Sequence, residues 1–549
     1  MRKWMTLLVA ALLIAGCAKE PQEKAADAIA ERLFGPGDPG EVVARELADP
    51  ASAWWQDLQN PADGPARIRQ ESAYRAHLTY KPAERLLTGE TGIIFTNRDV
   101  RPVKKIYLGA IARGLGDAES ADERWSLSDL RVDGKAASHK TEEDHTVISL
   151  PKPLVTGKTV VITFAFTAHL PVRSSEPQFG QVWSYGVDSS RATGLTEALP
   201  LILTDMDTMD HQDGRIIHPG TVARDIRLTL PADWRVLSSG STIGTEQQAD
   251  GQQQVRIVSA GQSFALFVTD ALEQVSSEAK GVRLIVHYRK GDQAGAEALL
   301  ADMANLLAAH AEALGSYPLR EAEIVPVTHA ALEGPGEWHD GLIRLSESYY
   351  RLSFMAPPPA VKDPWLKRVM TDDADQERRE TISHELAHAW WGYLIRSDRS
   401  RGRWWEEGIA EAASIAAVER AYGADAAKAL RDGTIFDYQR WRLNGVADIA
   451  PGEPPRDKAA LPEYKMMQYD KPALFYEKVR ALMGDDAYFA ALRRYMEARR
   501  HTVAADRGPV EELLGAPGVA ELYQRWMLET HGDEDIGLLT EEQIKQIAP

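Results

Sequence analysis

The spacing of hydrophobic residues changes once along this chain, and the change divides it into two structural classes. Over residues 74–80, 160–170 and 222–231, apolar side chains alternate with polar ones. Alternation with a period of two is typical of strands that bury one face, and the Gly, Asp and Pro residues between these segments favour turns. We therefore predict a β-rich domain over residues 73–277.

The apolar residues that follow this domain have the helical period instead. Residues 294–318 carry them at helical spacing, and Gly315 and Pro318 end the pattern as helix stop signals. From residue 372 onward nearly every segment reads as helix. We predict a second, mostly helical domain over residues 278–535, and hence an α+β multidomain fold.

The first seventeen residues describe an export signal. Arg2 and Lys3 give it a positive start, and residues 4–15 are apolar but too short to span a bilayer as a mature helix. The segment ends in Ile-Ala-Gly-Cys, which resembles the lipobox of bacterial lipoproteins, where the cysteine thiol is acylated. Cys17 is the only cysteine in the chain. We predict a lipid anchor there, and the alternative is a plain signal peptide with an incidental cysteine.

Location and partners follow from this anchor and from the charge. Ala18 follows the cysteine, and the bacterial sorting pattern then favours the outer membrane, so we expect a protein of the bacterial cell envelope that faces the periplasm. The net charge of −18 argues against nucleic acid, because a phosphate-backbone surface needs clustered Lys and Arg. A tether with a small helical extension over residues 18–72 and a tail over residues 536–549 complete the predicted organisation. The sequence indicates no oligomeric state.

His384, Glu385 and His388 form the pattern H-E-x-x-H. On a helix, positions i and i+4 lie on one face, so the two imidazoles can meet one Zn²⁺ at about 2.0–2.1 Å. The glutamate points off that axis, where it can act as a general base on water without binding the metal itself. A structural helix that carries two surface histidines has the same pattern, so a third ligand is needed.

The next amphipathic segment offers that ligand. A catalytic zinc requires a third protein ligand and one open position. Glu407 lies nineteen residues after His388, and the polar loop over residues 397–403 can turn the chain back so that the two helices run antiparallel. Glu411 lies four residues further and faces the same side as Glu407.

These segments resemble the aminopeptidase N family, peptidase family M1, of gluzincin metallopeptidases. The family uses H-E-L-A-H, eighteen residues and then E-G-[FI]-A-E, and Trp404 and Trp405 before the second motif fit it as well. The resemblance implies Glu407 as the third zinc ligand in preference to Glu406, which we expect to be a solvated acid at the helix start. Glu411 is either a hydrogen-bond partner of a ligand histidine or a plain charge on the helix face.

A later segment resembles the family's Y-x-K-G-A motif and the helices that follow it. Here the motif reads Y-D-K-P-A from Tyr469 onward, with Pro472 at the usual Gly. The resemblance implies that Tyr469 stabilises the oxyanion, for which one hydroxyl donor contributes about 3–4 kcal/mol. The alternative is a half-buried helix tyrosine with no role in the reaction.

The family's amine anchor, the glutamate of a G-x-M-E-N strand, is altered in this sequence. Gly336 and Glu337 supply the motif with one inserted residue, whereas Glu333 supplies it with a longer insertion. We prefer Glu337, and we expect the backbone of this strand to bind substrate as an added strand. The alternative for either glutamate is an exposed loop acid. Glu197 is a weaker candidate for a second amine anchor in the β-rich domain.

The resemblance implies a saddle-like β-rich domain followed by a thermolysin-like zinc-metallopeptidase domain that holds one Zn²⁺ per chain. The implied activity is that of an aminopeptidase that removes N-terminal residues from short peptides. The altered anchor leaves open an endopeptidase or oligopeptidase with the same zinc chemistry, and a non-catalytic lipoprotein that binds peptides is an alternative of another class. The large helical domain that covers the site in many relatives has no counterpart in this sequence, so we expect a more open site.

Overall fold

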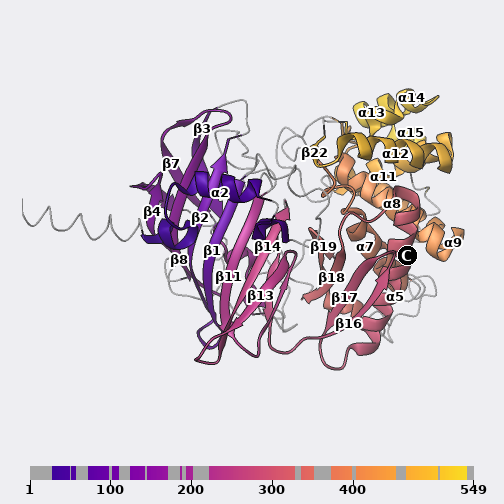
Figure 1. Ribbon diagram of the computed structural model, residues 1–549. Coiled ribbons are helices and arrows are strands. Elements are labelled where there is room, and N and C mark those ends of the chain that lie inside the picture. Colours follow the sequence, from indigo (N-terminus) through magenta and orange to yellow (C-terminus); the bar gives the residue numbers. More distant parts are fainter. Residues whose placement is uncertain are drawn as a thin grey trace, which may run out of the picture. The chain divides into compact units, whose positions relative to one another are not determined.

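The computed structural model divides into two compact units, residues 1–272 and 273–549 (Figure 1). The predicted domain boundary near residue 277 lies a few residues after this division. Cys17, Glu333 and the predicted C-terminal tail, apart from its first few residues, lie outside the described part of the chain. The structure describes residues 28–49, 51–56, 72–97, 102–109, 124–141, 145–170, 186–187, 193–201, 222–261, 263–327, 336–350, 373–397, 404–452, 465–504, 507–538 and 540.

An eight-stranded sheet is the main layer of the first unit. At its centre β1 (Ser72–Lys81) pairs in parallel with β11 (Val222–Pro231) and antiparallel with β2 (Leu86–Thr96). The predicted alternating segments are therefore strands, as expected. In spatial order the sheet runs β13 (Ser241–Gln247), β14 (Gln252–Gly261), β11, β1, β2, β8 (Thr159–His169), β4 (Trp125–Val132) and β5 (Lys135–Ala136).

The alternation of side chains along these strands explains the core of the first unit. Tyr74, Ala76 and Leu78 of β1 are buried together with Phe164 of β8 and Ile226 of β11, all on one face of the large sheet. Smaller sheets complete this β-rich unit. One contains β3 (Val103–Gly109), β7 (His145–Leu154) and β6 (His139–Thr141), and the other contains β12 (Arg235–Ser238), β15 (Leu266–Thr269), β10 (Thr193–Gly194) and β9 (Gly186–Val187).

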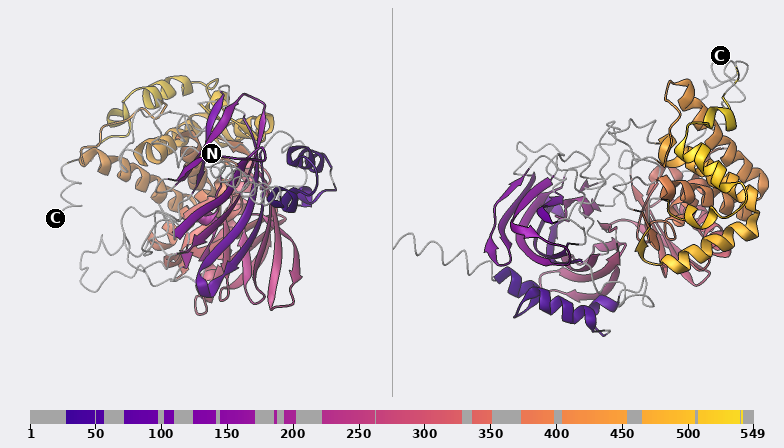
Figure 2. Two further views of the ribbon diagram at one scale, coloured as in Figure 1. Left: turned by 90° about the vertical axis from the view of Figure 1, so that its left-hand side faces the viewer. Right: turned by 90° about the horizontal axis from the view of Figure 1, so that it is seen from above.

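The predicted helical extension packs against the opposite face of the large sheet (Figure 2). It consists of a helix over residues 28–34, α2 (Pro39–Ala48) and the 3₁₀ turn η1 (Ala53–Gln56). Gly92 on β2 permits the close approach, because a Cβ there would lie 2.4 Å from the ring of Phe34. The extension covers the small apolar residues of this face in a second, separate core cluster.

A five-stranded sheet organises the second unit. Its spatial order is β16 (Glu273–Ala279), β17 (Val282–Tyr288), β18 (Glu321–Val327), β20 (Leu342–Ser346) and β19 (Gly336–His339). β19 runs antiparallel to β20 at one edge, and no further strand pairs with β19 in the part of the chain that the structure describes. One face of this sheet is buried against α5 (Gln293–Leu314), which ends just before Gly315 as predicted.

Helices make up most of the remaining second unit, as the sequence predicts, and the fold class is α+β. Among the described residues, no helix has both the length and the apolar character that a membrane span requires. In chain order the elements are η7 (Glu347–Tyr350), α7 (Asp373–Ala387), β21 (Ile395–Arg396), α8 (Trp404–Tyr422), α9 (Ala424–Leu443), η9 (Met466–Asp470), α11 (Lys471–Met483), α12 (Asp485–Arg499), β22 (Thr502–Val503), α13 (Val510–Leu513), α14 (Val519–Tyr523), η10 (Gln524–Leu528) and α15 (Gly532–Asp535).

Candidate metal centre

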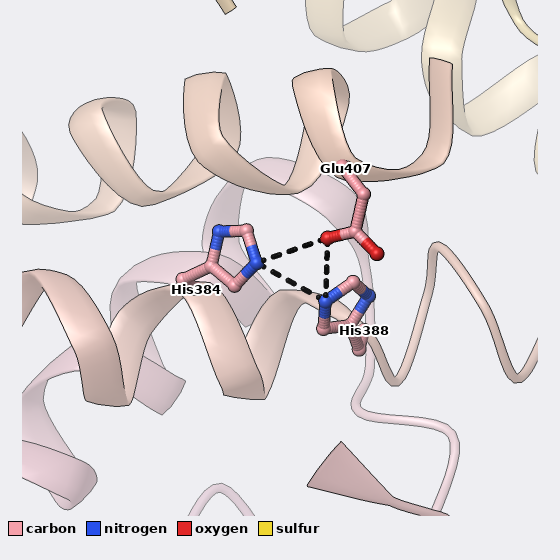
Figure 3. Close-up of side chains that lie close together, drawn as sticks. All are labelled: His384, His388 and Glu407. Atoms are coloured by element: carbon pink, nitrogen blue, oxygen red, sulfur yellow. Dashed lines mark hydrogen bonds and ion pairs between the residues drawn. The ribbon is translucent and has the colours of Figure 1, made fainter. Parts of the chain in front are cut away.

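His384, His388 and Glu407 converge on one point between two helices (Figure 3). The Nε2 atoms of the two histidines lie 3.1 Å apart, and Glu407 Oε2 lies 3.3 Å from the first and 3.4 Å from the second. Ligand atoms at about 2.1 Å from a tetrahedral zinc are separated by roughly 3.4 Å. The three atoms therefore fit three corners of a zinc tetrahedron, and the fourth corner is left for water or substrate.

The other ring nitrogens fix the tautomers of both histidines. His384 Nδ1–H donates to Glu411 Oε2 at 2.8 Å, and His388 Nδ1–H donates to the backbone carbonyl of Trp391 at 2.9 Å. In the neutral form of both rings, each Nε2 therefore presents a lone pair, and both lone pairs face a carboxylate. Such an arrangement is repulsive unless a cation lies between these atoms, so the donor set fits Zn²⁺.

The electrostatics of this cluster also favour a positive charge. Burial lowers the pKa of His384, but hydrogen bonding to Glu407 and Glu411 outweighs it and raises that pKa well above its usual value. All the ligand side chains are largely buried. The buried carboxylates are thus arranged around a point where one cation would neutralise them.

A buried histidine on α5 helps to hold the zinc helix in place. His310 Nε2–H donates to the carbonyl and the hydroxyl oxygen of Ser383, each at 2.9 Å, in the residue before the first ligand. Burial lowers the pKa of His310 to about 4, so the ring stays neutral at pH 7. Because α5 also forms the core beneath α7, the position of His384 is tied to the packing of the unit.

The sequence-based expectation for Glu406 is wrong. Its side chain is 2% exposed, and Oε2 accepts hydrogen bonds from the backbone N of Ser397 at 3.0 Å and from the Ser397 hydroxyl at 2.6 Å. Ser397, in the segment after α7, thus reaches the start of α8 and covers this carboxylate. Glu406 therefore braces the connection between the helices that carry the three ligands. Trp404 and Trp405, which precede it on the helix, are also buried.

Glu385 lies against the edge strand β19. A Cβ on Gly336 would lie 3.0 Å from Glu385 Oε1 and 2.7 Å from the side chain of Thr381, so only glycine allows this approach. Trp338, two residues on, has its ring 6.3 Å from that of His388. Burial is the main cause that raises the pKa of Glu385 above its usual value. The predicted base and the predicted substrate strand are thus neighbours.

Glu337 points away from the zinc helix, because successive side chains of a strand alternate between its two faces. Its cross-strand partner is Arg344, and the two form an ion pair, while His339 Nε2 lies 3.4 Å from the other carboxylate oxygen. Burial would raise the pKa of Glu337, but the charge of Arg344 lowers it far below its usual value. The predicted amine anchor is therefore a carboxylate that is already paired with Arg344 and lies beside His339.

Tyr469 lies beside the first zinc ligand. It is half-buried in the π-helical turn η9, and its ring stacks on that of His384 with 5.9 Å between centroids. Pro472, in the altered motif that follows Tyr469, packs directly against α8. A Cβ on Gly408 would lie 2.2 Å from Cβ of Pro472, so Gly408 supplies the space at this helix contact.

Three contributors to the site were missed or left undecided at the sequence level. The Trp391 carbonyl has no sequence signature, because any residue supplies the same backbone atom. Glu411 was one of two alternatives, and its contact with His384 decides for the hydrogen-bond partner. Arg344 follows from the pairing of β19 with β20, which the sequence does not specify across an altered loop.

Comparisons with known proteins agree with this geometry. Residues 364–526 match the peptidase family M1 domain. An aminopeptidase N from Streptomyces lividans is 28% identical over 201 residues, which are 33% of this chain and 22% of that relative, so the chain spans about a fifth of its length.

Solved structures share the fold. An M1 zinc metallopeptidase from Deinococcus radiodurans superposes with a TM-score of 0.57 at 17% identity, over 83% of this chain and 94% of that one. A mutant of the Deinococcus enzyme bound to a Tyr-Ser-Ala substrate gives a TM-score of 0.56 at 17% identity, over 86% and 97%. The segment that matches the family contains every ligand of the zinc-type cluster, and the chain carries a peptidase family M1 domain there.

Proposed function

We propose that the protein hydrolyses peptide bonds as a zinc-dependent aminopeptidase that acts on short peptides. The observation that carries this proposal is the buried triangle of two Nε2 atoms and one carboxylate oxygen with Glu385 beside it. A structural zinc site uses four protein ligands, whereas three ligands leave a position open for chemistry.

We assign the side chains around the cluster the following roles. Zinc, when bound, supplies a Lewis acid that makes water acidic near neutral pH. A carboxylate oxygen of Glu385 takes the proton of the attacking water and passes it to the nitrogen of the leaving amine. The hydroxyl of Tyr469 donates a hydrogen bond to the oxyanion of the tetrahedral intermediate.

The edge strand supports binding of an extended peptide. β19 has one side paired with β20, and in the described part of the chain its other side has no strand partner. A peptide can add there as a further strand, beside the strand that Gly336 allows to lie against Glu385. In this arrangement Glu337, whose charge also raises the pKa of Glu385, is the candidate for the α-amine. The Deinococcus mutant complex with Tyr-Ser-Ala supports a short peptide as substrate.

The pairing of Glu337 favours an endopeptidase or oligopeptidase as the second candidate. Arg344 and His339 flank both carboxylate oxygens, so an incoming amine would share the carboxylate with two side chains. A weakly attracting amine anchor would let the site accept peptides without a free N-terminus.

The decisive experiment profiles cleavage of one peptide library with free and with N-acetylated termini by the zinc-loaded protein. We expect release of N-terminal residues from the free peptides, loss of turnover in Glu385→Gln and reduced kcat in Tyr469→Phe with zinc content unchanged. Internal cleavage of acetylated peptides would support the second candidate. A zinc-loaded protein that cleaves neither library would overturn the enzyme proposal in favour of a peptide-binding protein.

We also propose that a lipid on Cys17 anchors the protein in the bacterial envelope. The anchor lies in the outer membrane, and the domains face the periplasm. The support is the single cysteine at the end of an export signal. Labelling with a fatty-acid analogue, compared with Cys17→Ser, should show lipid on the wild type alone. An unlabelled wild-type protein that fractionates with soluble periplasmic proteins would contradict it.

A further inference from the structure

The first unit contains a cavity of about 280 Å³ that has no part in the proposed peptidase chemistry. It lies where the helical extension meets the outer face of the large sheet, on the face opposite the main core. Strands β1, β11 and β14 form its floor, and residues around η1 form one wall. Its lining residues are Arg32, Leu33, Glu46, Ser52, Ala53, Trp54, Arg75, His77, Asp225, Arg227 and Arg256.

A row of basic side chains crosses the floor of this cavity. His77 on β1 is paired in register with Arg227 on β11, and Arg227 is directly opposite Arg256 on β14. Directly opposed residues of neighbouring strands point to the same face, and like charges in such pairs are destabilising. This chain places two arginines opposite one another although its net charge is −18. An anion between them would remove the repulsion.

The carboxylates nearby neutralise only part of this charge. Asp225 accepts two hydrogen bonds from Arg256, at 2.9 and 2.8 Å, and lies 3.4 Å from Nε of Arg75. Glu46 pairs with Arg75 as well. Arg227 is exposed and forms no ion pair or hydrogen bond with the residues that the structure describes. Among the described residues, the guanidinium of Arg227 therefore has no ion-pair partner.

Three other groups that line the cavity can contact a ligand beside Arg227. Burial, followed by the charge of Arg227, lowers the pKa of His77 below its usual value, so the imidazole is neutral at pH 7 and can hydrogen-bond a ligand. On the wall, the hydroxyl of Ser52 is buried and has no hydrogen-bond partner among the described residues. Arg256 uses Nε and Nη2 on Asp225, and its Nη1 remains as a donor.

We propose that this cavity binds the phosphate group of a small molecule or of a lipid headgroup. A tetrahedral phosphate presents oxygens in several directions, so it can meet two guanidiniums on neighbouring strands and a hydroxyl on the wall at the same time. A planar carboxylate would satisfy one guanidinium fork at a time. The cavity is close to the lower limit of about 300 Å³ for small-molecule sites, so it can take a phosphate group with a small substituent.

The test is calorimetric titration of the full zinc-loaded protein with inorganic phosphate and with glycerol phosphate. We expect binding in the wild type and at least tenfold weaker binding in Arg227→Gln, which removes the uncompensated charge from an exposed position. Arg235→Gln on β12, outside the cavity, is the matched control and should bind as the wild type does. Phosphate bound elsewhere, including at zinc, would remain in Arg227→Gln. Equal binding in both variants, or none in the wild type at about 10 mM, overturns the proposal.

A second measurement locates the ligand independently of any substitution. The imidazole proton resonances of His77 should shift during phosphate titration, and a titration that leaves them unmoved contradicts the proposed position. Vesicles of phosphatidylglycerol distinguish the two sources, with Cys17→Ser protein used so that the anchor makes no contribution. Vesicle binding that requires Arg227 and that glycerol phosphate displaces assigns the headgroup, whereas binding of glycerol phosphate alone assigns a soluble ligand. This proposal is independent of peptidase activity, so either can fail without the other.

Discussion

Replacing Glu411 with Gln tests how far zinc affinity depends on the side chain that orients His384. The carboxylate accepts the Nδ1–H of His384 at 2.8 Å in a largely buried site. Burial would raise the pKa of Glu411, but the hydrogen bond from His384 lowers it below its usual value, so the group is charged at neutral pH. Glutamine keeps the shape and an accepting oxygen but loses the charge that makes the imidazole a stronger ligand.

The expected loss of zinc affinity is about 10–100-fold, which is the range for removing such a partner from a ligand histidine. That corresponds to about 1.4–2.7 kcal/mol. The burial of this pair places the expected loss toward the upper part of the range, because a hydrogen bond to a charged group is stronger where water is excluded.

Zinc affinity is measured by competition with a chromogenic chelator, which gives a dissociation constant without any peptidase assay. Glu419→Gln on the same helix is the matched control, because Glu419 pairs with Arg480 at 2.7 Å and belongs to no part of the metal cluster. The control should bind zinc as the wild type does. If Glu411→Gln also keeps the wild-type dissociation constant, the assignment of Glu411 as the orienting partner is wrong.

Substitutions at three further positions probe the surroundings of the site. Gly408→Ala should lower the melting temperature, since its Cβ would lie 2.2 Å from that of Pro472 and overpacking costs about 1–3 kcal/mol; an unchanged melting temperature would refute the helix contact. Glu406→Ala should destabilise by about 1–3 kcal/mol for each buried donor left unpaired, with Glu406→Gln in between, and calorimetry measures both. Arg344→Gln should lower KM severalfold for peptides with a free amine because Glu337 loses its competing partner, while N-acetylated peptides keep their KM. A free-amine KM that stays constant would exclude Arg344 from specificity.

The zinc ligands could be predicted because their geometry is local. His384 and His388 are one helical turn apart, and Glu407 lies in the first turn of the next helix after a short loop, while the family resemblance favoured Glu407 over Glu406. The strands of the first unit were equally readable, because each buries one face and therefore alternates. Tyr469 depended on a motif match, and the structure places its ring beside His384.

The incorrect and undecided assignments all depend on contacts between segments that the sequence does not show to be neighbours. Glu406 looks like a solvated acid, since helix starts are commonly exposed, and only the position of Ser397 shows that it is enclosed. Glu337 was the preferred match to the glutamate of the family motif. The sequence does not show that its side chain meets Arg344, because strand register sets that pairing. The charged row on the outer sheet face likewise exists only after β1, β11 and β14 are placed side by side.

The two ligand histidines differ in how easily mutation can disturb them. His384 is oriented by a carboxylate that a single codon change can remove, whereas His388 is oriented by the main-chain carbonyl of Trp391, which every substitution at that position retains. Among descendants of this sequence, drift that spares the ligands themselves should therefore weaken the centre through position 411 and leave the His388 half intact. Natural variants that keep H-E-x-x-H but change this glutamate are therefore the ones to test for a retained fold that no longer binds zinc.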